Sequence, residues 1–189
     1  MVLPGLIPWT ALAVAWQWLL GVLPSLTILF VGMRFLLEIP QREKQAKYQA
    51  WRVVHTAYGQ KVSGARIAAL EDLREQGESL SRLTLEEGAM LNKINLAGSD
   101  LFHASLSGAG LWCDNLHKAK LESAYLSNAN LHKAILLSTD LYKADLRGAD
   151  LCLANLTGAI YSKKTQFSKD FDPSQHGMVL QDDRDFQPA

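Results

Sequence analysis

Leucine recurs every five residues through the middle of the chain. The repeat runs without a break over Leu91, Leu96, Leu101, Leu106, Leu111, Leu116, Leu121, Leu126, Leu131, Leu136, Leu141, Leu146, Leu151 and Leu156. A second constrained position falls two residues earlier, from Ala89 to Ala159, and eleven of its fifteen residues are alanine. We expect both positions to point inward and to form the structural core.

Neither a helix nor a flat strand can gather this period on one face. A helix turns about 100° per residue, so five residues turn it by about 140° and scatter the leucines around the axis. Five is also odd, so successive leucines of a flat strand would point to opposite faces. The period is satisfied if each pentad is a short extended piece followed by a corner, because repeated corners wind the chain into a solenoid.

The pentads resemble the pentapeptide-repeat family, whose pattern is A-(D/N)-L-x-x. The likeness is plainest at residues 129–131, 144–146, 149–151 and 154–156, which read ANL, ADL, ADL and ANL. It implies a mainly β fold, a right-handed quadrilateral β-helix with four pentads per coil and coils stacked about 4.8 Å apart. Residues 51–73 also resemble the approach to the repeats in membrane-tethered family members from cyanobacteria.

A helical cap is expected before the repeats, because an open solenoid end would expose the core. Residues 65–76 carry an amphipathic pattern, and Gly77 is placed to end the helix. Leu80 and Leu85 are five residues apart, but Leu85 and Leu91 are six apart. This insertion predicts an irregular corner between them.

A second cap is expected after the repeats. Phe167, Phe171 and Pro173 can cover the last coil, and the residues beyond Gly177 are expected to form a loose tail.

The first 33 residues carry no charged side chain and are rich in large apolar residues. A bilayer crossing needs about 20 apolar residues, so we predict a transmembrane helix near residues 11–33. Two alternatives stay open: a hairpin around Pro24, and a signal peptide cleaved near residues 11–15. The cleavage reading lacks a basic region before the apolar run.

The flank that follows carries five basic and two acidic side chains between Arg34 and Arg52. By the positive-inside rule, this excess predicts that the repeats lie in the cytoplasm. The membrane is expected to be the plasma or the thylakoid membrane. Tyr48, Trp51 and His55 lie on a helical stripe that would rest at the headgroups or pack on the next domain. The predicted organisation is an anchor over 1–39, a juxtamembrane helix over 40–60, a helical cap over 61–79, a β-helix over 80–161 and a C-terminal cap with a flexible tail over 162–189.

Charge argues against nucleic-acid partners. Lysine plus arginine and aspartate plus glutamate both number 19, and residues 91–161 hold six of each sign. Some members of the resembled family inhibit or protect type II topoisomerases by mimicking DNA with strongly acidic faces. A regulator that acts by DNA mimicry is therefore the alternative function, and the neutral charge and the anchor disfavour it.

No residue set looks catalytic, and no cofactor, metal or small-molecule substrate is expected. His103, His117 and His132 share no column when coils hold twenty residues, and Cys113 and Cys152 fall about 10 Å apart, beyond disulfide reach. Nucleotide-loop, zinc-protease and serine-hydrolase motifs are missing from the sequence. Asp114 is unusual because it occupies an inward slot where alanine dominates, so it must be hydrogen-bonded or displaced.

Outward positions sorted into columns twenty residues apart suggest one interaction surface. The columns beside Leu111, Leu131 and Leu151 bring an apolar group to one face, and the columns at Ser127 and Asn128, read as the opposite side, are polar or glycine. The candidate surface comprises Trp112, Cys113, Cys152 and Leu153, with Ile135 and Leu137 on the next face. We therefore expect a membrane-tethered, non-enzymatic scaffold that binds another protein.

Overall fold

The computed structural model describes residues 33, 40–57, 59–60 and 62–182. The chain divides into two compact units, Met1–Lys47 and Tyr48–Ala189. In the first unit, residues 40–47 are helical. The predicted anchor over residues 1–39 lies outside the described residues, apart from residue 33. Among the helices that are described, none has the length and apolar character needed to cross a membrane.

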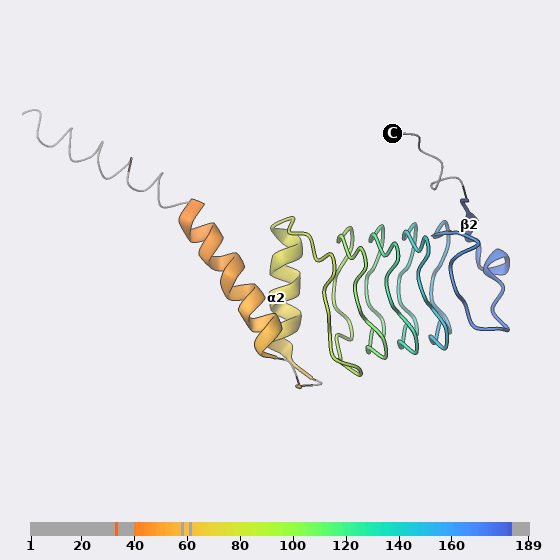
Figure 1. The fold of residues 1–189 in the computed structure, drawn as a ribbon, viewed down its shortest axis with the longest axis horizontal. Coiled ribbons are helices and arrows are strands. Elements are labelled where there is room, and N and C mark those ends of the chain that lie inside the picture. The colour runs from red at the N-terminus through yellow and green to blue at the C-terminus, as the bar shows by residue number, and fades with distance from the viewer. Residues whose placement is uncertain (1–32, 34–39, 58, 61, 183–189) are drawn as a thin grey trace, which may run out of the picture. The chain divides into compact units, whose positions relative to one another are not determined.

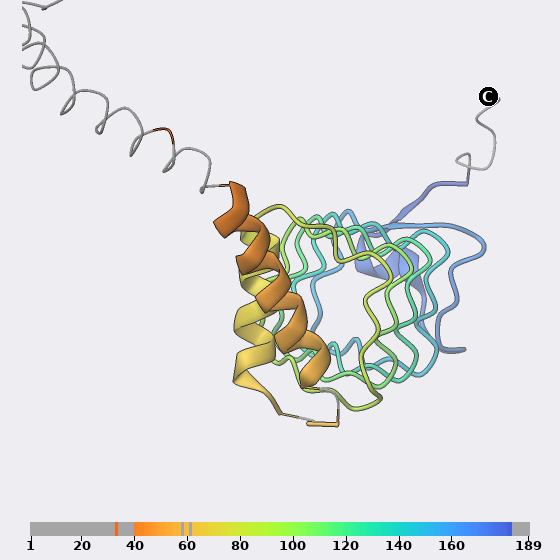
Figure 2. The ribbon, with the colours of Figure 1, turned by 60° about the vertical axis from the view of Figure 1, so that its left-hand side comes forward.

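Stacked coils dominate the second unit (Figures 1 and 2). Parallel bridges join residues twenty apart in four ladders, which fall on four sides of each coil. Representative pairs are Gly110 with Asn130, Asn115 with Ile135, Lys120 with Asp140, and Tyr125 with Asp145. The β-helix solenoid with four pentads per coil is thus confirmed.

Each corner is a tight turn that follows a leucine. In the first regular corner, the N–H of Ile94 donates to the carbonyl of Leu91 at 3.0 Å, and Lys93 between them has a φ of 68°. A positive φ at the third residue is the mark of a type II turn. Eleven non-glycine residues of the described chain have positive φ, and each lies two residues after a leucine position. Such backbone costs about 1–2 kcal/mol per residue, so the ladders must impose it.

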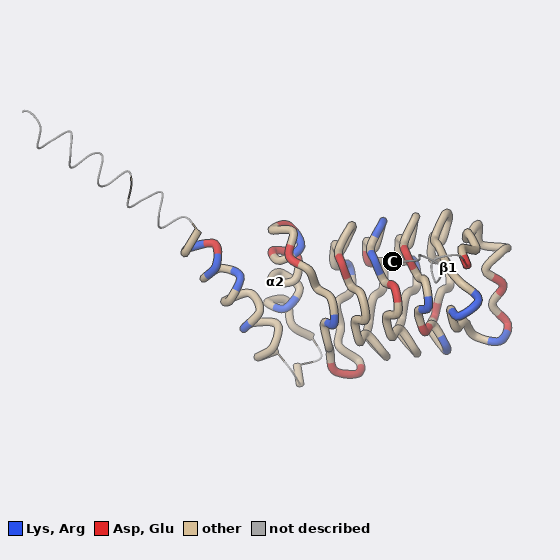
Figure 3. Tube along the Cα trace, turned by 45° about the horizontal axis from the view of Figure 1, so that its top comes forward, with Lys and Arg blue, Asp and Glu red and all other residues tan. Residues whose placement is uncertain are grey.

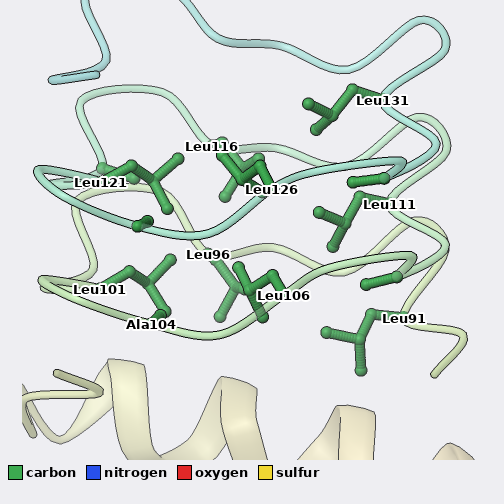
Figure 4. Close-up of a cluster of buried hydrophobic side chains, with 14 of the residues drawn as sticks. Leu91, Leu96, Leu101, Ala104, Leu106, Leu111, Leu116, Leu121, Leu126 and Leu131 are labelled. Atoms are coloured by element: carbon green, nitrogen blue, oxygen red, sulfur yellow. The ribbon is translucent and has the colours of Figure 1, made fainter. Parts of the chain in front are cut away.

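The leucines fill the inside of the coils. All fourteen are buried, with at most 9% of the side chain exposed. Figure 4 shows Leu91, Leu111 and Leu131 stacked above one another, each pointing into the solenoid. Alanine at the second inward position leaves room for these stacks, because the two positions share the same narrow interior.

The asparagine or aspartate before many leucines has a structural role. Its side chain accepts the backbone N–H of the residue after the leucine, as Asn95 does from Ala97 at 3.2 Å and Asp100 does from Phe102 at 3.2 Å. This local bond gives an acceptor to a backbone N–H that lies in the turn and does not take part in the ladder. The A-(D/N)-L pattern is therefore explained by the corner.

Regular strands are few, which differs from the expected mainly β content. Only β1 (Ile160–Tyr161) and β2 (Val179–Leu180) are strands within the described residues, while the four ladders consist of single bridges. The reason is geometric, because each pentad spends most of its length in the corner and leaves one residue to pair.

Two extra residues interrupt the period. Thr84 pairs with Ser105, a separation of 21, whereas Met90 pairs with Gly110, a separation of 20, so the expected irregular corner lies between Thr84 and Met90. A second, unexpected insertion follows Ile160, since Asp145 pairs with Gln166. The ladders therefore extend beyond the predicted end of the β-helix at residue 161.

Helices cover the first coil of the second unit. In this unit residues 48–56 are helical, and α2 runs over Gly64–Glu75, so it starts and ends one residue before the predicted bounds. Ala50 and Val54 join the same buried cluster as Leu70 and Leu73, so this part of the predicted juxtamembrane helix packs on the solenoid. Gly77, with a φ of 69°, ends α2, and the N–H of Glu78 donates to the carbonyl of Leu73 at 2.9 Å.

The expected loose tail is partly ordered. A 3-10 helix spans Pro173–His176, and β2 pairs in parallel with β1, with Val179 opposite Ile160. The N–H of Val179 donates to the carbonyl of Ala159 at 2.8 Å, so these residues satisfy the backbone that the last coil would leave open. The tail prediction is wrong for residues 178–181, and residues 183–189 lie outside the described part of the chain.

Candidate functional site

Three successive corners form the centre of the predicted interaction surface. The N–H of Cys113 donates to the carbonyl of His132 at 3.0 Å, and the N–H of Lys133 donates to the carbonyl of Cys152 at 3.0 Å. These bonds stack the corners that follow Leu111, Leu131 and Leu151. We call the outward residues 112–113, 132–133 and 152–153 the corner face.

The apolar residues of the corner face differ in exposure. Leu153 is 69% exposed, and Cys152 is also exposed. Trp112 and Cys113 are half-buried, and the ammonium of Lys93 lies 5.3 Å from the centre of the Trp112 ring. The polar pair of residues 132–133 separates Trp112 from Leu153, so the apolar surface is interrupted rather than continuous.

The other two predicted residues lie on the next side of the coil. Ile135 is 42% exposed and pairs with Asn115 and Asn155 in the ladder. Leu137 is half-buried, and its carbonyl lies 2.9 Å from Nδ1 of His117. Ile135 therefore extends the corner face, whereas Leu137 offers less accessible surface.

Tyr125 is a large exposed side chain that the sequence analysis did not single out. It is 51% exposed and belongs to the ladder on the side opposite Ile135. Both residues occupy the slot before a leucine where aspartate or asparagine is typical, and this departure from the repeat pattern was the available signal.

The polar columns at Ser127 and Asn128 lie one corner away from the corner face, not on the opposite side. The ladder through Asn130 and Asp150 separates the two corners. Ser127 Oγ donates to Ser107 Oγ at 3.0 Å along the polar column. The corner opposite the corner face is the one that holds residues 103, 123 and 143.

The described C-terminal segment reaches Cys152 but leaves Leu153 exposed. Phe167 and Phe171 pack against the core, with ring centroids 5.0 Å apart, and His176 stacks on Phe171 at 4.6 Å. A pocket of about 190 Å³ between this segment and the last coil is lined by Ala149, Leu151, Cys152, Ser168, Phe171 and His176.

Comparison with known families identifies the coils. The family model "Pentapeptide repeats" matches residues 119–158 in eight copies. Residues 119–158 are therefore pentapeptide repeats. Curated proteins give no match to the chain.

Solved pentapeptide-repeat structures resemble parts of the chain. HetL, involved in heterocyst differentiation regulation in the cyanobacterium Nostoc sp. strain PCC 7120, is 35% identical, with 47% of this chain and 38% of HetL covered and a TM-score of 0.41. A second protein from Nostoc PCC 7120 is 29% identical, with 60% and 94% covered and a TM-score of 0.33. Rfr23 from the cyanobacterium Cyanothece 51142 is 31% identical, with 55% and 54% covered and a TM-score of 0.26. The chain thus spans less than two thirds of HetL and of Rfr23.

Asp114 is an acidic side chain inside the core of the solenoid. It is fully buried, and desolvation raises the pKa of its carboxyl to about 8, against backbone N–H donors at Lys93 and Ile94 that lower the pKa. Glu71 of α2 adds a smaller repulsion that raises the pKa further. The expected hydrogen bond is present, because the N–H of Ile94 donates to Oδ1 of Asp114 at 3.2 Å. The raised pKa means that burial also favours the protonated carboxyl.

A buried arginine beneath the first coil was not predicted from the sequence. Arg66 of α2 is 1% exposed, and its Nη2 donates to Oε1 of Glu86 at 2.7 Å and to the carbonyl of Ala57. Nε and Nη1 of Arg66 have no hydrogen-bond partner among the described residues. The pair joins the helical cap to the irregular corner, which suits a structural role.

Proposed function

We propose that the chain is a membrane-tethered, non-enzymatic interaction module that displays its pentapeptide-repeat solenoid in the cytoplasm. Another protein would bind the corner face, with Trp112 and Leu153 as apolar anchors and Ile135 beside them. The observation that carries the proposal is the exposure of Leu153, which is 69% exposed on a corner that is bonded to the preceding coil through the N–H of Lys133 and the carbonyl of Cys152. Aromatic residues at such positions are frequent binding hot spots.

The shape of the surface supports a protein partner. Ladder hydrogen bonds on both sides hold the corners, so a partner would meet side chains that are already positioned and lose little freedom on binding. The half-buried Trp112 ring lies under the ammonium of Lys93, so an apolar and a cationic group meet on this surface. Such mixed surfaces are typical of interfaces between proteins that also exist apart.

The proposed membrane tether is supported by the sequence of the first residues. The 33 uncharged residues are long enough to cross a bilayer, and the basic flank after them favours the cytoplasm for the repeats. Figure 3 shows basic and acidic residues interspersed along the coils, and this mixture gives no support to DNA mimicry.

The test compares proteins that co-purify from detergent-solubilised membranes. The double variant Trp112→Arg plus Leu153→Glu should lose a partner that wild type retains, because it places charges in the apolar contact. Ser127→Arg tests an adjacent corner. His103→Glu tests the opposite corner at an exposed position with the same backbone, since φ is 54° at His103 and 59° at Leu153.

All variants should show the wild-type circular dichroism and melting temperature. A folded double variant that keeps every wild-type partner would place the docking face elsewhere. Loss of the same partner in His103→Glu would show that the effect is not specific to the corner face.

A further inference from the structure

Three potential metal ligands meet at the edge of the corner face. His132 and Cys152 hold the same position in successive coils, and Asp150 lies two residues before Cys152. One ligand atom from each, an imidazole nitrogen, a carboxylate oxygen and a sulfur, all lie within 4.8 Å of one another. Nδ1 of His132 is 3.9 Å from Oδ2 of Asp150. Among the described residues, this is the group of three His, Cys, Asp or Glu side chains whose ligand atoms lie close enough to share one ion.

The repeat fixes the backbone beneath all three side chains. Oδ1 of Asp150 accepts the N–H of Cys152 at 2.9 Å, and Oδ1 of Asn130 accepts the N–H of His132 at 3.1 Å. The N–H of Asp150 donates to the carbonyl of Ala129 at 2.9 Å. Asp150 therefore turns one oxygen to its own corner and leaves Oδ2 toward His132. A metal ion would need to order only side-chain rotamers, which keeps the entropic cost of binding low.

The donor set selects the class of ion. Calcium and magnesium prefer oxygen ligands alone, so a thiolate and an imidazole disfavour them. Zinc accepts sulfur, nitrogen and carboxylate oxygen together, with bonds of about 2.0–2.3 Å in a tetrahedron. Those bonds place ligand atoms about 3.3–3.8 Å apart, so the observed spacing closes by modest side-chain rotation.

We propose that His132, Asp150 and Cys152 bind a divalent ion of the zinc class across two coils. Imidazole Nδ1, carboxylate Oδ2 and the Cys152 thiolate are the three protein ligands, and the thiol loses its proton on binding. Three protein ligands leave one tetrahedral position open, and water fills it. Asp150 is 52% exposed, so that position faces solvent.

The site does not depend on the proposed docking function. The site lies among the polar residues between Trp112 and Leu153. A bound ion would link adjacent coils, because His132 and Cys152 are twenty residues apart. The three histidines share no column with one another, but His132 shares one with Cys152, twenty residues further along the chain.

Cobalt titration of the detergent-solubilised, tag-free full chain under reducing conditions tests the site. Wild type should bind one Co²⁺ per chain, with a sulfur-to-cobalt charge-transfer band and intense visible bands of tetrahedral cobalt, and Zn²⁺ should displace it. Cys152→Ser should lose the charge-transfer band. His132→Gln and Asp150→Asn should weaken Co²⁺ binding by at least about tenfold.

Matched controls replace the same residue types on neighbouring corners. Cys113→Ser and His117→Gln should bind Co²⁺ as wild type does. Zn²⁺ should also raise the melting temperature of wild type and Cys113→Ser, but not that of Cys152→Ser, because the ion binds only the folded site. The proposal is overturned if folded wild type gives no thiolate band, or if the band survives Cys152→Ser.

Discussion

Asp114 accepts a hydrogen bond from the backbone N–H of Ile94, one coil away, through Oδ1 at 3.2 Å. Its other oxygen, Oδ2, is buried and has no hydrogen-bond partner in the described part of the chain. The position belongs to the inward column in which Ala134 and Ala154 follow in the next two coils. One acidic group is therefore enclosed by apolar neighbours, and its charge state should control stability.

The first prediction is that Asp114→Asn removes a pH dependence of stability. The carboxyl has a pKa of about 8 when folded and an ordinary value of 3.8, so between these limits the folded chain holds a proton that the unfolded chain has released. Stability then falls as pH rises through this window, and the penalty is absent below about pH 4. The gain in unfolding free energy from Asp114→Asn should grow by about 1.4 kcal/mol per pH unit across the window.

Urea denaturation of wild type and Asp114→Asn at several pH values between about pH 5 and about pH 8 checks this sign. A difference between the two proteins that stays constant with pH would show that the carboxyl does not titrate in this range.

The second prediction concerns the leucine register. Leu121→Asp should prevent folding, because an unpaired buried charge costs several kcal/mol against a typical stability of about 5–15 kcal/mol. Leu121→Ala should fold but lose about 2–5 kcal/mol. Ser127→Asp should be nearly neutral, since Ser127 is only half-buried and Arg147 follows it in the column. Equal melting temperatures for the three variants would refute the predicted leucine register.

The third prediction concerns the ion pair of Arg66 and Glu86. Glu86→Ala should destabilise the chain by about 3–5 kcal/mol, because it leaves a buried guanidinium without its carboxylate. The double variant Arg66→Met plus Glu86→Ala should lose less, since no unpaired charge remains. Chemical denaturation of both variants measures the difference. A double variant less stable than Glu86→Ala would show that the bond from Arg66 to the carbonyl of Ala57 outweighs the cost of the unpaired charge.

The fourth prediction concerns topology. If a single span near residues 11–33 leaves the repeats in the cytoplasm, protease added to right-side-out vesicles should spare the repeat domain. Detergent lysis should then expose it to cleavage at the same protease concentration. Digestion of the repeats in intact vesicles would show that they lie on the outer side of the membrane, against the prediction.

Sequence periodicity predicted the coil because the five-residue spacing of the leucines equals the length of one side of the coil. The period places every leucine on one inner surface, and the six-residue step after Leu85 located the irregular corner. The positive φ values of Lys93 and Cys113 were harder to predict, because only some corners carry glycine at the same position, as Gly108 does. Tertiary bonds between coils impose that conformation.

Contacts between distant segments were harder to foresee. Arg66 looks like a solvated residue of an amphipathic helix, and its carboxylate partner lies twenty residues away in the irregular corner. The pairing of Val179 with Ile160 joins a segment outside the repeat to the last coil. The cluster of His132, Asp150 and Cys152 follows from the column spacing, but only when different ligand types are compared.

Site-specific photo-crosslinking in native membranes tests the proposed docking face most directly. A photoreactive residue would replace Leu153 in one full-length chain and His103, the exposed residue with matching backbone on the opposite corner, in another. The account predicts a discrete crosslinked product from position 153 and none from position 103. An equal product from both positions, or a product from position 103 alone, would contradict it.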